Sequence, residues 1–417
     1  MSKESLSLPH PASVTRRKVP LTTPLRHTRY RQLWLANLIS NLGTWTQTFA
    51  SAWLIATVST SASTSTLVQT ATYVPVFLFA LFAGVIADAV HRPKFLFWCN
   101  AFMALCACSL ALLVKTGNAA PGPVLAITFC IGAGSAFMWP AWQASMAGLV
   151  DPDEVEAAAT LNNLSYNVAA IVGPALGGVL FAWIGPGSLF LINAVSFIGM
   201  LGVYGMWWRE SAAPPVVRTS FVSSLKLGLT SALGCHRYRR ILINVSTVFF
   251  ATIAFAGLLP VFVKNVLHLN SSVFGMLMGS LGVGAVCGAL LLPTIRQHVG
   301  KTRLLAASLF VYGIMLITLP FLRSLALMVP LIMAAGMAWS ATVSTLNAAA
   351  QLAFPLAIRA RTLSIYLFVM AGGYTVGSLV WGRVADHFGV QAALSAAGAC
   401  VIINAAALLT GKRETSI

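Results

Sequence analysis

The chain has 417 residues, of which 58% are hydrophobic and only 8% are charged. A soluble globular domain carries about 25% charged residues, so this composition excludes soluble enzymes, collagen-like proteins and disordered proteins. The net charge is +17, from 26 Lys and Arg residues against 9 Asp and Glu residues. Because the basic residues lie in loops between long apolar segments, we expect this charge to meet anionic membrane lipids, and we expect no nucleic-acid partner.

The predicted elements begin with a basic segment, residues 1–32, which is rich in Pro, Ser and Thr. We expect it to be a cytosolic tail, because the apolar stretch that follows is too long for the core of a signal peptide. A helix that spans a bilayer needs roughly 20 apolar residues. Twelve segments meet that length, at about 33–58, 64–87, 95–114, 123–147, 156–183, 188–208, 240–264, 271–295, 302–322, 327–352, 360–382 and 390–410.

One long connection divides these twelve spans into two groups of six. We therefore predict an all-α polytopic membrane protein with six-helix bundles at 33–208 and 240–410, a cytoplasmic linker at 209–239 and a short cytosolic tail at 411–417. The linker holds apolar residues at helical spacing, namely Phe221, Val222, Leu225, Leu229 and Leu233. This spacing predicts a short amphipathic helix on the membrane surface.

The basic residues also predict the orientation of the chain in the membrane. If the N-terminus is cytoplasmic, 22 of the 26 Lys and Arg residues lie on that side and 4 lie on the other side. Short cytoplasmic loops carry an excess of basic residues. We therefore expect both termini on the cytoplasmic side of a bacterial inner membrane, and we expect the protein to be a monomer.

The second span ends in the sequence GVIADAVHRPK, which contains Gly84, Asp88, Arg92 and Lys94. An acidic residue at a helix end can meet both the basic residues that follow it and the N-terminus of a facing helix. This pattern resembles the loop motif of the major facilitator superfamily, except that His91 stands where the motif more often has Gly. The resemblance implies that the eleventh span faces Asp88. A structural lock between the halves is the favoured role, and a proton carrier is the alternative.

The enterobactin-exporter-like branch of this superfamily is similar to three longer stretches of the chain, residues 30–54, 140–178 and 359–389. Members of that branch export siderophores, drugs or other secondary metabolites, and the substrate differs among relatives. The resemblance implies two pseudo-symmetric halves that rock about a central cavity. It also implies a small-molecule substrate and, as in many relatives, protons as a second partner.

Small residues mark places where helix backbones can approach closely. The sequence GPALGG in the fifth span resembles the end of a motif of drug/proton antiporters. The residues concerned are Gly173, Pro174, Gly177 and Gly178, with Gly373 and Gly377 at an offset of 200 residues from the first and third. A proline kinks a helix and glycines allow close packing, so these residues predict either a hinge or static helix packing.

In the major facilitator fold the first, fourth, seventh and tenth spans line the central cavity, so the resemblance makes their polar residues the candidate substrate site. Side chains three and four positions apart share one face of a helix. Two spans carry such stripes, the first at Asn37, Asn41, Thr44 and Thr48 and the tenth at Ser340, Ser344, Asn347 and Gln351. The fourth and seventh spans add Trp142, Gln143, Asn244 and Thr247. Hydrogen bonds between helices could satisfy any one of these residues without a ligand, but two stripes together favour a hydrated cavity.

All nine acidic residues lie near the ends of the spans or outside them, and no histidine lies at mid-depth. A cavity without a carboxylate disfavours cationic substrates and favours neutral or anionic amphiphiles. A proton step must then use Asp88, a group near a helix end or the substrate itself.

The seven cysteines form no Cys/His cluster, and no phosphate-binding loop, metal-ligand spacing or catalytic triad pattern is present. We therefore expect no enzyme activity, no cofactor and no bound metal. The function that we expect is a secondary-active exporter of small amphiphilic molecules, driven by the proton gradient. An importer of a small organic solute and a non-transporting membrane sensor or scaffold are the alternatives.

Overall fold

The computed structural model describes residues 19–210 and 221–410. Residues 1–18 of the predicted N-terminal tail, 211–220 of the linker and the predicted tail at 411–417 lie outside these ranges. Within the described ranges the chain forms helices and no β-strand. This confirms the all-α fold class that the composition predicts.

The N-terminal half contains η1 (Thr23–Arg26), α1 (Thr28–Val58), α2 (Ala62–Ala89), α3 (Arg92–Lys115), α4 (Pro121–Ala147), η2 (Pro152–Glu154) and α5 (Val155–Glu210). The linker contains α6 (Phe221–Gly234), at the position of the predicted amphipathic helix. The C-terminal half contains α7 (His236–Val261), η3 (Phe262–Val266), α8 (Ser271–His298), α9 (Lys301–Thr318), η4 (Leu319–Phe321), α10 (Leu325–Leu352), α11 (Leu356–Phe388) and α12 (Val390–Thr410).

Ten helices of the described residues are long and apolar enough to cross a membrane. Helix α1 is not among the ten, because polar residues such as Asn37, Asn41 and Gln47 lower its hydropathy. Helix α5 counts once but holds two predicted spans, because Gly185 adopts a φ of 74° and interrupts the helix before Pro186. A positive φ suits glycine, which has no Cβ. Including α1 and dividing α5 at Gly185 gives the twelve predicted spans.

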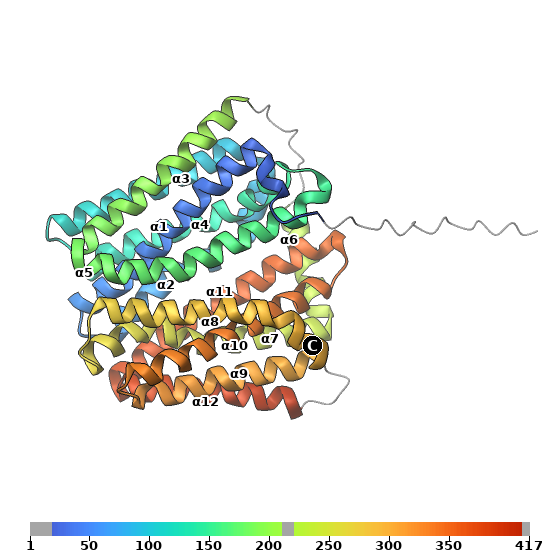
Figure 1. The fold of residues 1–417 in the computed structure, drawn as a ribbon. Coiled ribbons are helices and arrows are strands. Elements are labelled where there is room, and N and C mark those ends of the chain that lie inside the picture. The colour runs from blue at the N-terminus through green and yellow to red at the C-terminus, as the bar shows by residue number, and fades with distance from the viewer. Residues whose placement is uncertain (1–18, 211–220, 411–417) are drawn as a thin grey trace, which may run out of the picture.

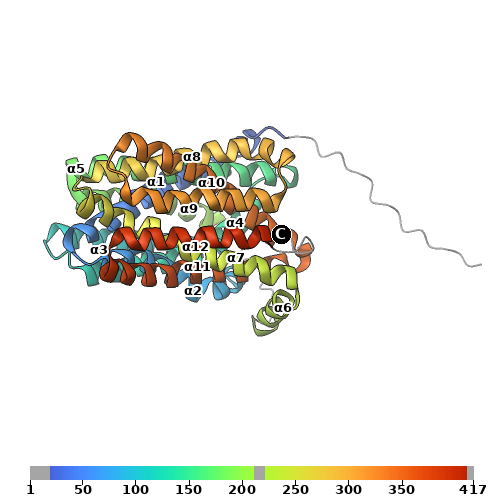
Figure 2. The same cartoon turned by 90° about the horizontal axis from the view of Figure 1, so that it is seen from below.

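Figure 1 shows α1–α5 packed together in one half of the molecule and α7–α12 in the other, and Figure 2 shows the second half from below. One contact recurs near the start of each half. The Tyr30 hydroxyl on α1 donates a hydrogen bond to the Ala158 carbonyl on α5 at 2.9 Å. The Tyr238 hydroxyl on α7 donates to the Thr362 carbonyl on α11 at 2.6 Å. The first and fifth spans of each half are thus joined in the same way, as expected for pseudo-symmetric halves.

The two halves meet chiefly along two helix pairs, α5 with α8 and α2 with α11. Between α5 and α8 the backbones touch, because a Cβ on Gly275 would lie 2.7 Å from the Pro174 carbonyl oxygen and 2.9 Å from the Gly178 Cα. Between α2 and α11, the Phe77 and Phe368 rings stack with centroids 4.4 Å apart. Backbone contact and ring stacking therefore both hold the halves together.

Charged residues of the C-terminal half hold the ends of two N-terminal helices, and we name this contact the outer latch. The Asp386 carboxylate on α11 accepts hydrogen bonds from the Ser61 hydroxyl at 2.8 Å and the Ala62 N–H at 2.6 Å, at the start of α2. The Lys264 ammonium, in η3, donates to the Ala56 carbonyl at the end of α1 at 2.6 Å. The outer latch closes the end of the molecule at which α1 and α2 are joined, opposite to the end that holds α6 (Figures 1 and 2).

Candidate functional site

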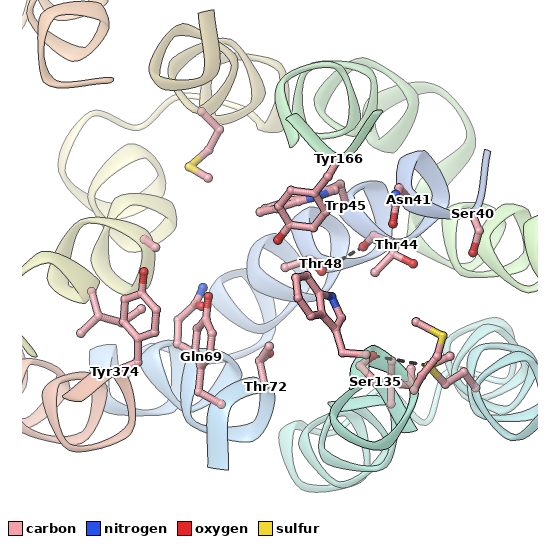
Figure 3. Close-up of a pocket in the computed structure, with 18 of the residues that line it drawn as sticks. Ser40, Asn41, Thr44, Trp45, Thr48, Gln69, Thr72, Ser135, Tyr166 and Tyr374 are labelled. Carbon is pink, nitrogen blue, oxygen red and sulfur yellow. Dashed lines mark hydrogen bonds between the residues drawn. The ribbon is translucent and has the colours of Figure 1, made fainter. Parts of the chain in front are cut away.

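A cavity of about 360 Å³ lies between the two halves of the molecule. Helices α1–α5 and α7–α11 all contribute lining residues. No lining residue in the described part of the chain is Asp, Glu, Lys, Arg or His. The cavity therefore offers uncharged polar groups and aromatic faces, and Figure 3 shows part of its wall.

One wall of the cavity is polar and is built by α1 and α2. Its residues lie at helical spacing, with Asn37, Asn41, Thr44 and Thr48 on α1 and Gln69 and Thr72 on α2. The Thr48 hydroxyl donates to the Thr44 carbonyl at 2.9 Å and keeps its own capacity to accept a bond. Among the described residues, the amides of Asn37, Asn41 and Gln69 make no hydrogen bond, so they are available to a ligand.

Many aromatic side chains also line the cavity. The Trp and Tyr residues among them are Trp45, Tyr73, Trp139, Tyr166, Tyr312, Trp339 and Tyr374. Trp45 and Tyr166 meet edge to face, with ring centroids 5.7 Å apart, and Figure 3 shows them beside Thr44 and Thr48. Such rings accept planar apolar groups, and Trp and Tyr also present an N–H or O–H donor.

The cavity ends toward the outer latch at a contact between α2 and α11. The Tyr73 and Tyr374 rings pack there with centroids 4.3 Å apart. The Thr70 and Ser378 hydroxyls share a hydrogen bond of 2.7 Å one turn nearer the latch. Because both pairs join the two halves, the halves must separate here before the cavity can open on the latch side.

The α1 stripe lines the cavity, whereas the candidates on α4 lie elsewhere. Trp142 is 7% exposed and packs in an apolar cluster with Tyr30 and Leu96. It lies one turn nearer the end of α4, where this helix packs against α1 and α3. Gln143 is exposed and does not line the cavity either. Trp139, one turn earlier, is the α4 tryptophan that does.

Asn244 and Thr247 on α7 also lie outside the cavity lining. The Asn244 amide donates to the Arg240 carbonyl of its own helix at 2.9 Å, and the Thr247 hydroxyl accepts a bond from Asn404 on α12. Helix α7 instead contributes a later turn, with Thr252 among the lining residues. The seventh span therefore does reach the cavity, but not through the residues that the sequence singled out.

The α10 stripe lies beyond the cavity lining, toward the end of the helix. Its members are Ser340, Ser344, Asn347 and Gln351. The Gln351 amide donates to the Asn347 side-chain oxygen at 2.7 Å, so these two amides satisfy each other in part. Trp339 is the α10 residue that lines the cavity. A role of the stripe in substrate binding stays a prediction.

Sequence reasoning missed lining residues on helices other than the four that the family resemblance named. They include Gln69, Thr72 and Tyr73 on α2, Tyr166 on α5 and Tyr374 on α11. The three α2 residues follow the spacing i, i+3, i+4, which places them on one helix face. The signal that identified the α1 stripe was therefore also present in α2.

The motif that follows the second span is described only in part. Gly84 and Asp88 belong to α2, but the surroundings of Gly84 and the side chain of Asp88 lie outside the described part of the structure. Arg92 is the first residue of α3, and Lys94 is exposed. The His91 ring caps α3 by accepting a hydrogen bond from the Lys94 N–H, which gives this departure from the motif a structural role. The coupling role of the motif stays a prediction.

The candidate hinge residues lie at close contacts between helices. A Cβ on each glycine would press on a neighbouring helix, which is α1 for Gly173 and Gly177, α8 for Gly178, and α7 for Gly373 and Gly377. The Pro174 carbonyl lies at the contact with α8. These contacts fit the interpretation as helix packing, and a hinge role stays a prediction.

Residues 20–414 match the family model described as "Transmembrane secretion effector". The staphyloferrin A transporter of Staphylococcus aureus is 26% identical over 87% of this chain and 90% of its own length. The multidrug efflux pump Tap of Mycolicibacterium fortuitum is 22% identical over 82% of this chain and 85% of its own length. Both likenesses therefore extend over most of the two halves.

Solved structures of transporters share the fold. The nucleoside transporter NupG aligns with a TM-score of 0.70 at 12% identity, over 91% of this chain and 98% of its own. A bacterial homologue of the iron transporter ferroportin, in an inward-facing state, aligns with a TM-score of 0.64 at 14% identity, over 91% of this chain and 98% of its own. At such identities the likeness shows the fold alone.

Proposed function

The chain belongs to the transmembrane secretion effector family of the major facilitator transporters, and from this premise we propose that it exports small amphiphilic molecules by alternating access. The substrate class that we propose is that of siderophores, drugs or other secondary metabolites that enter the cavity without net charge.

The uncharged cavity between the halves carries this proposal. An amphiphile can place polar groups against Asn41 and Gln69 and a planar apolar part against Tyr73 and Tyr374. Each such hydrogen bond contributes about 0.5–1.5 kcal/mol net. A charged group would instead lose its hydration without meeting an opposite charge, which costs more than these bonds return. Neutral amphiphiles are therefore favoured.

The outer latch supports loading of the cavity from the opposite side. If both termini are cytoplasmic, the latch faces the cell exterior, and a substrate enters from the cytoplasm. Export then requires the α2–α11 and α5–α8 contacts to separate while the opposite ends of the same helices close. This sequence of states is alternating access in the export direction.

The proton gradient is the energy source that we propose. The described cavity lining holds no carboxylate or imidazole, so a proton has to travel on another group. Asp88 or a group near a helix end is one such carrier, and an acidic substrate that binds in its protonated form is another. Binding in the protonated form also allows an acidic substrate to enter a cavity whose described lining has no basic residue to pair with a carboxylate.

Accumulation measurements in cells test the proposal. Siderophores and neutral drugs are suitable compounds, because the relatives include a staphyloferrin A transporter and a multidrug efflux pump. Cells that contain the chain should retain less of at least one neutral amphiphile than cells without it, and a proton uncoupler should remove the difference. Higher retention would favour an importer. Equal retention of every compound, with the chain present in the membrane, would favour a sensor or scaffold.

A further inference from the structure

One short connection of this basic chain is acidic. Four of the nine acidic residues, Asp151, Asp153, Glu154 and Glu156, lie within six positions between the fourth and fifth spans. The connection contributes no residue to the cavity lining. The proposed transport function therefore does not account for this concentration of negative charge.

The fold brings a histidine to two of these carboxylates. His27 immediately precedes α1, and its Nε2 lies 2.7 Å from a carboxylate oxygen of Glu154. One ligand atom each from His27, Asp151 and Glu154 lies within 4.8 Å of the other two. These residues come from segments more than a hundred positions apart, so their spacing in the sequence could not reveal the cluster.

The backbone positions of two of these residues supply a second observation. His27 is the N-cap of α1 and Asp151 is the N-cap of η2. An Asp at an N-cap ordinarily accepts a hydrogen bond from a free N–H of the first turn. Neither side chain makes such a cap bond here, and both turn toward the shared point instead.

We propose that His27, Asp151 and Glu154 bind a divalent first-row transition-metal ion of the Mn²⁺, Fe²⁺ or Zn²⁺ class. Two carboxylates this close repel each other, and a divalent cation between them removes that repulsion. An imidazole nitrogen favours these ions over Ca²⁺ and Mg²⁺, which prefer oxygen ligands alone. Three protein ligands also leave a coordination position for water.

The site is accessible to ions from solvent and lies at a structural junction. Asp151 is exposed and the His27 side chain is 35% exposed, whereas that of Glu154 is 12% exposed. The ion would join the start of α1 to the connection before α5, where Tyr30 already bonds to Ala158. Metal binding would therefore stabilise the contact between α1 and α5, independently of substrate transport.

Metal titration of the full-length protein tests this proposal. The protein is purified without a polyhistidine tag, and Zn²⁺ and Mn²⁺ are titrated separately by calorimetry. Saturable binding of one ion per chain is expected, with a higher thermal unfolding midpoint when the ion is bound. Loss of a ligand in His27→Ala or Glu154→Gln should lower the affinity at least about tenfold.

The matched control is Asp153→Asn, which removes a carboxylate of the same connection that lies outside the cluster. Its affinity should equal that of the unmodified chain. Because Glu154→Gln preserves side-chain volume, a monodisperse preparation of this variant separates loss of a ligand from loss of folding. The proposal is overturned if neither ion binds saturably, or if Asp153→Asn weakens binding as much as Asp151→Asn.

Discussion

Asn41 and Gln69 stand apart from most polar residues of this chain, because their amides face the cavity without a protein partner in the described structure. A buried amide in a membrane protein otherwise bonds to a neighbouring helix, as the Asn193 amide does when it donates to Gln47 at 2.6 Å. The two amides are therefore among the residues at which a substrate gains hydrogen bonds without displacing protein contacts.

Replacing either amide should weaken substrate binding while the protein stays folded. One hydrogen bond contributes about 0.5–1.5 kcal/mol, so Asn41→Ala or Gln69→Ala should raise the apparent Kd about 2- to 12-fold. The measurement is concentration-dependent flux in vesicles. Ser109→Ala is the control, because Ser109 is exposed on α3 and bonds only to the Leu105 carbonyl of its own helix. Unchanged transport kinetics in both amide variants would show that the polar wall is not part of the substrate-binding site.

Residue spacing identified a polar face of α1 whose residues line the cavity, but it could not orient the other helices. Periodicity shows which side chains share a face, and only packing decides where that face points. Thr247 illustrates the difference, because its partner Asn404 is 157 positions away on α12. The aromatic residues were missed for a related reason, since Tyr374 fits a packing role and a cavity role equally well.

At the scale of elements, the outer latch places a negative charge at the N-terminus of one helix and a positive charge at the C-terminus of another. Asp386 meets the N-terminus of α2, where N–H groups are free, and Lys264 meets the C-terminus of α1, where carbonyl groups are free. Both signs agree with the direction of the helix dipole. The latch therefore holds two helix ends of one half with two charges of the other half.

Removing the carboxylate charge should favour opening on the latch side. An exposed interaction of this type is worth about 1 kcal/mol, so Asp386→Asn should increase the population of the open state about fivefold. The measurement is the rate at which an impermeant reagent alkylates a Thr70→Cys residue from the latch side, in a chain whose native cysteines are replaced. Asp153→Asn should leave that rate unchanged. An equal rate in Asp386→Asn would show that the latch does not control opening.

The glycine contact between α5 and α8 makes a separate prediction about stability. A Cβ on Gly275 would lie 2.7 Å from the Pro174 carbonyl oxygen, so Gly275→Ala forces the helices apart at a cost of about 1–3 kcal/mol. Gly202→Ala is the matched control, because nothing lies within 4 Å of a Cβ at that position. Thermal unfolding of the two purified variants should show a lower midpoint for Gly275→Ala only. Equal midpoints would mean that the contact is not close-packed in the membrane.

Sequence patterns located the elements well, because twenty-residue apolar segments are a strong signal in a bilayer. The division of α5 at Gly185 falls between the predicted spans, and α6 spans the predicted amphipathic pattern from Phe221 to Leu233. Contacts between elements could not be predicted from the sequence. The pairing of Gly178 with Gly275 and of Asp386 with Ala62 depends on how the two halves meet.

At the scale of the whole molecule, the family match confirms the predicted resemblance to major facilitator transporters and the prediction that the chain is not an enzyme. The orientation of that fold in the membrane stays a prediction, and it decides whether the outer latch faces the cell exterior. The distribution of basic residues, 22 against 4, is its basis.

A reporter fused after Ile417 tests the orientation directly. A phosphatase that folds only outside the cytoplasm should be inactive there, and a fluorescent protein that folds only in the cytoplasm should be bright. The same pair of reporters fused after Lys115, at the end of α3, should give the reverse result. Phosphatase activity after Ile417 would place the termini outside and would contradict the proposed loading of the cavity from the cytoplasm.

The claim that the cavity selects neutral amphiphiles is tested most clearly by a cationic substrate. Two effects of opposite sign act on a cation in this cavity. Aromatic faces attract a cation by about 0.5–2 kcal/mol each. Transfer of an ion from water into a cavity without an opposite charge costs several kcal/mol. We expect the second effect to dominate, since no lining residue of the described chain is acidic.

The most direct measurement is flux of a matched pair of compounds through the purified protein in vesicles. One compound is a neutral planar aromatic amine, and the other is its quaternary ammonium analogue of similar size. We predict saturable transport of the neutral compound, with lower apparent affinity in Gln69→Ala, and no competition by the quaternary cation. Saturable, competitive transport of the quaternary cation would contradict the account of an uncharged cavity that selects neutral amphiphiles.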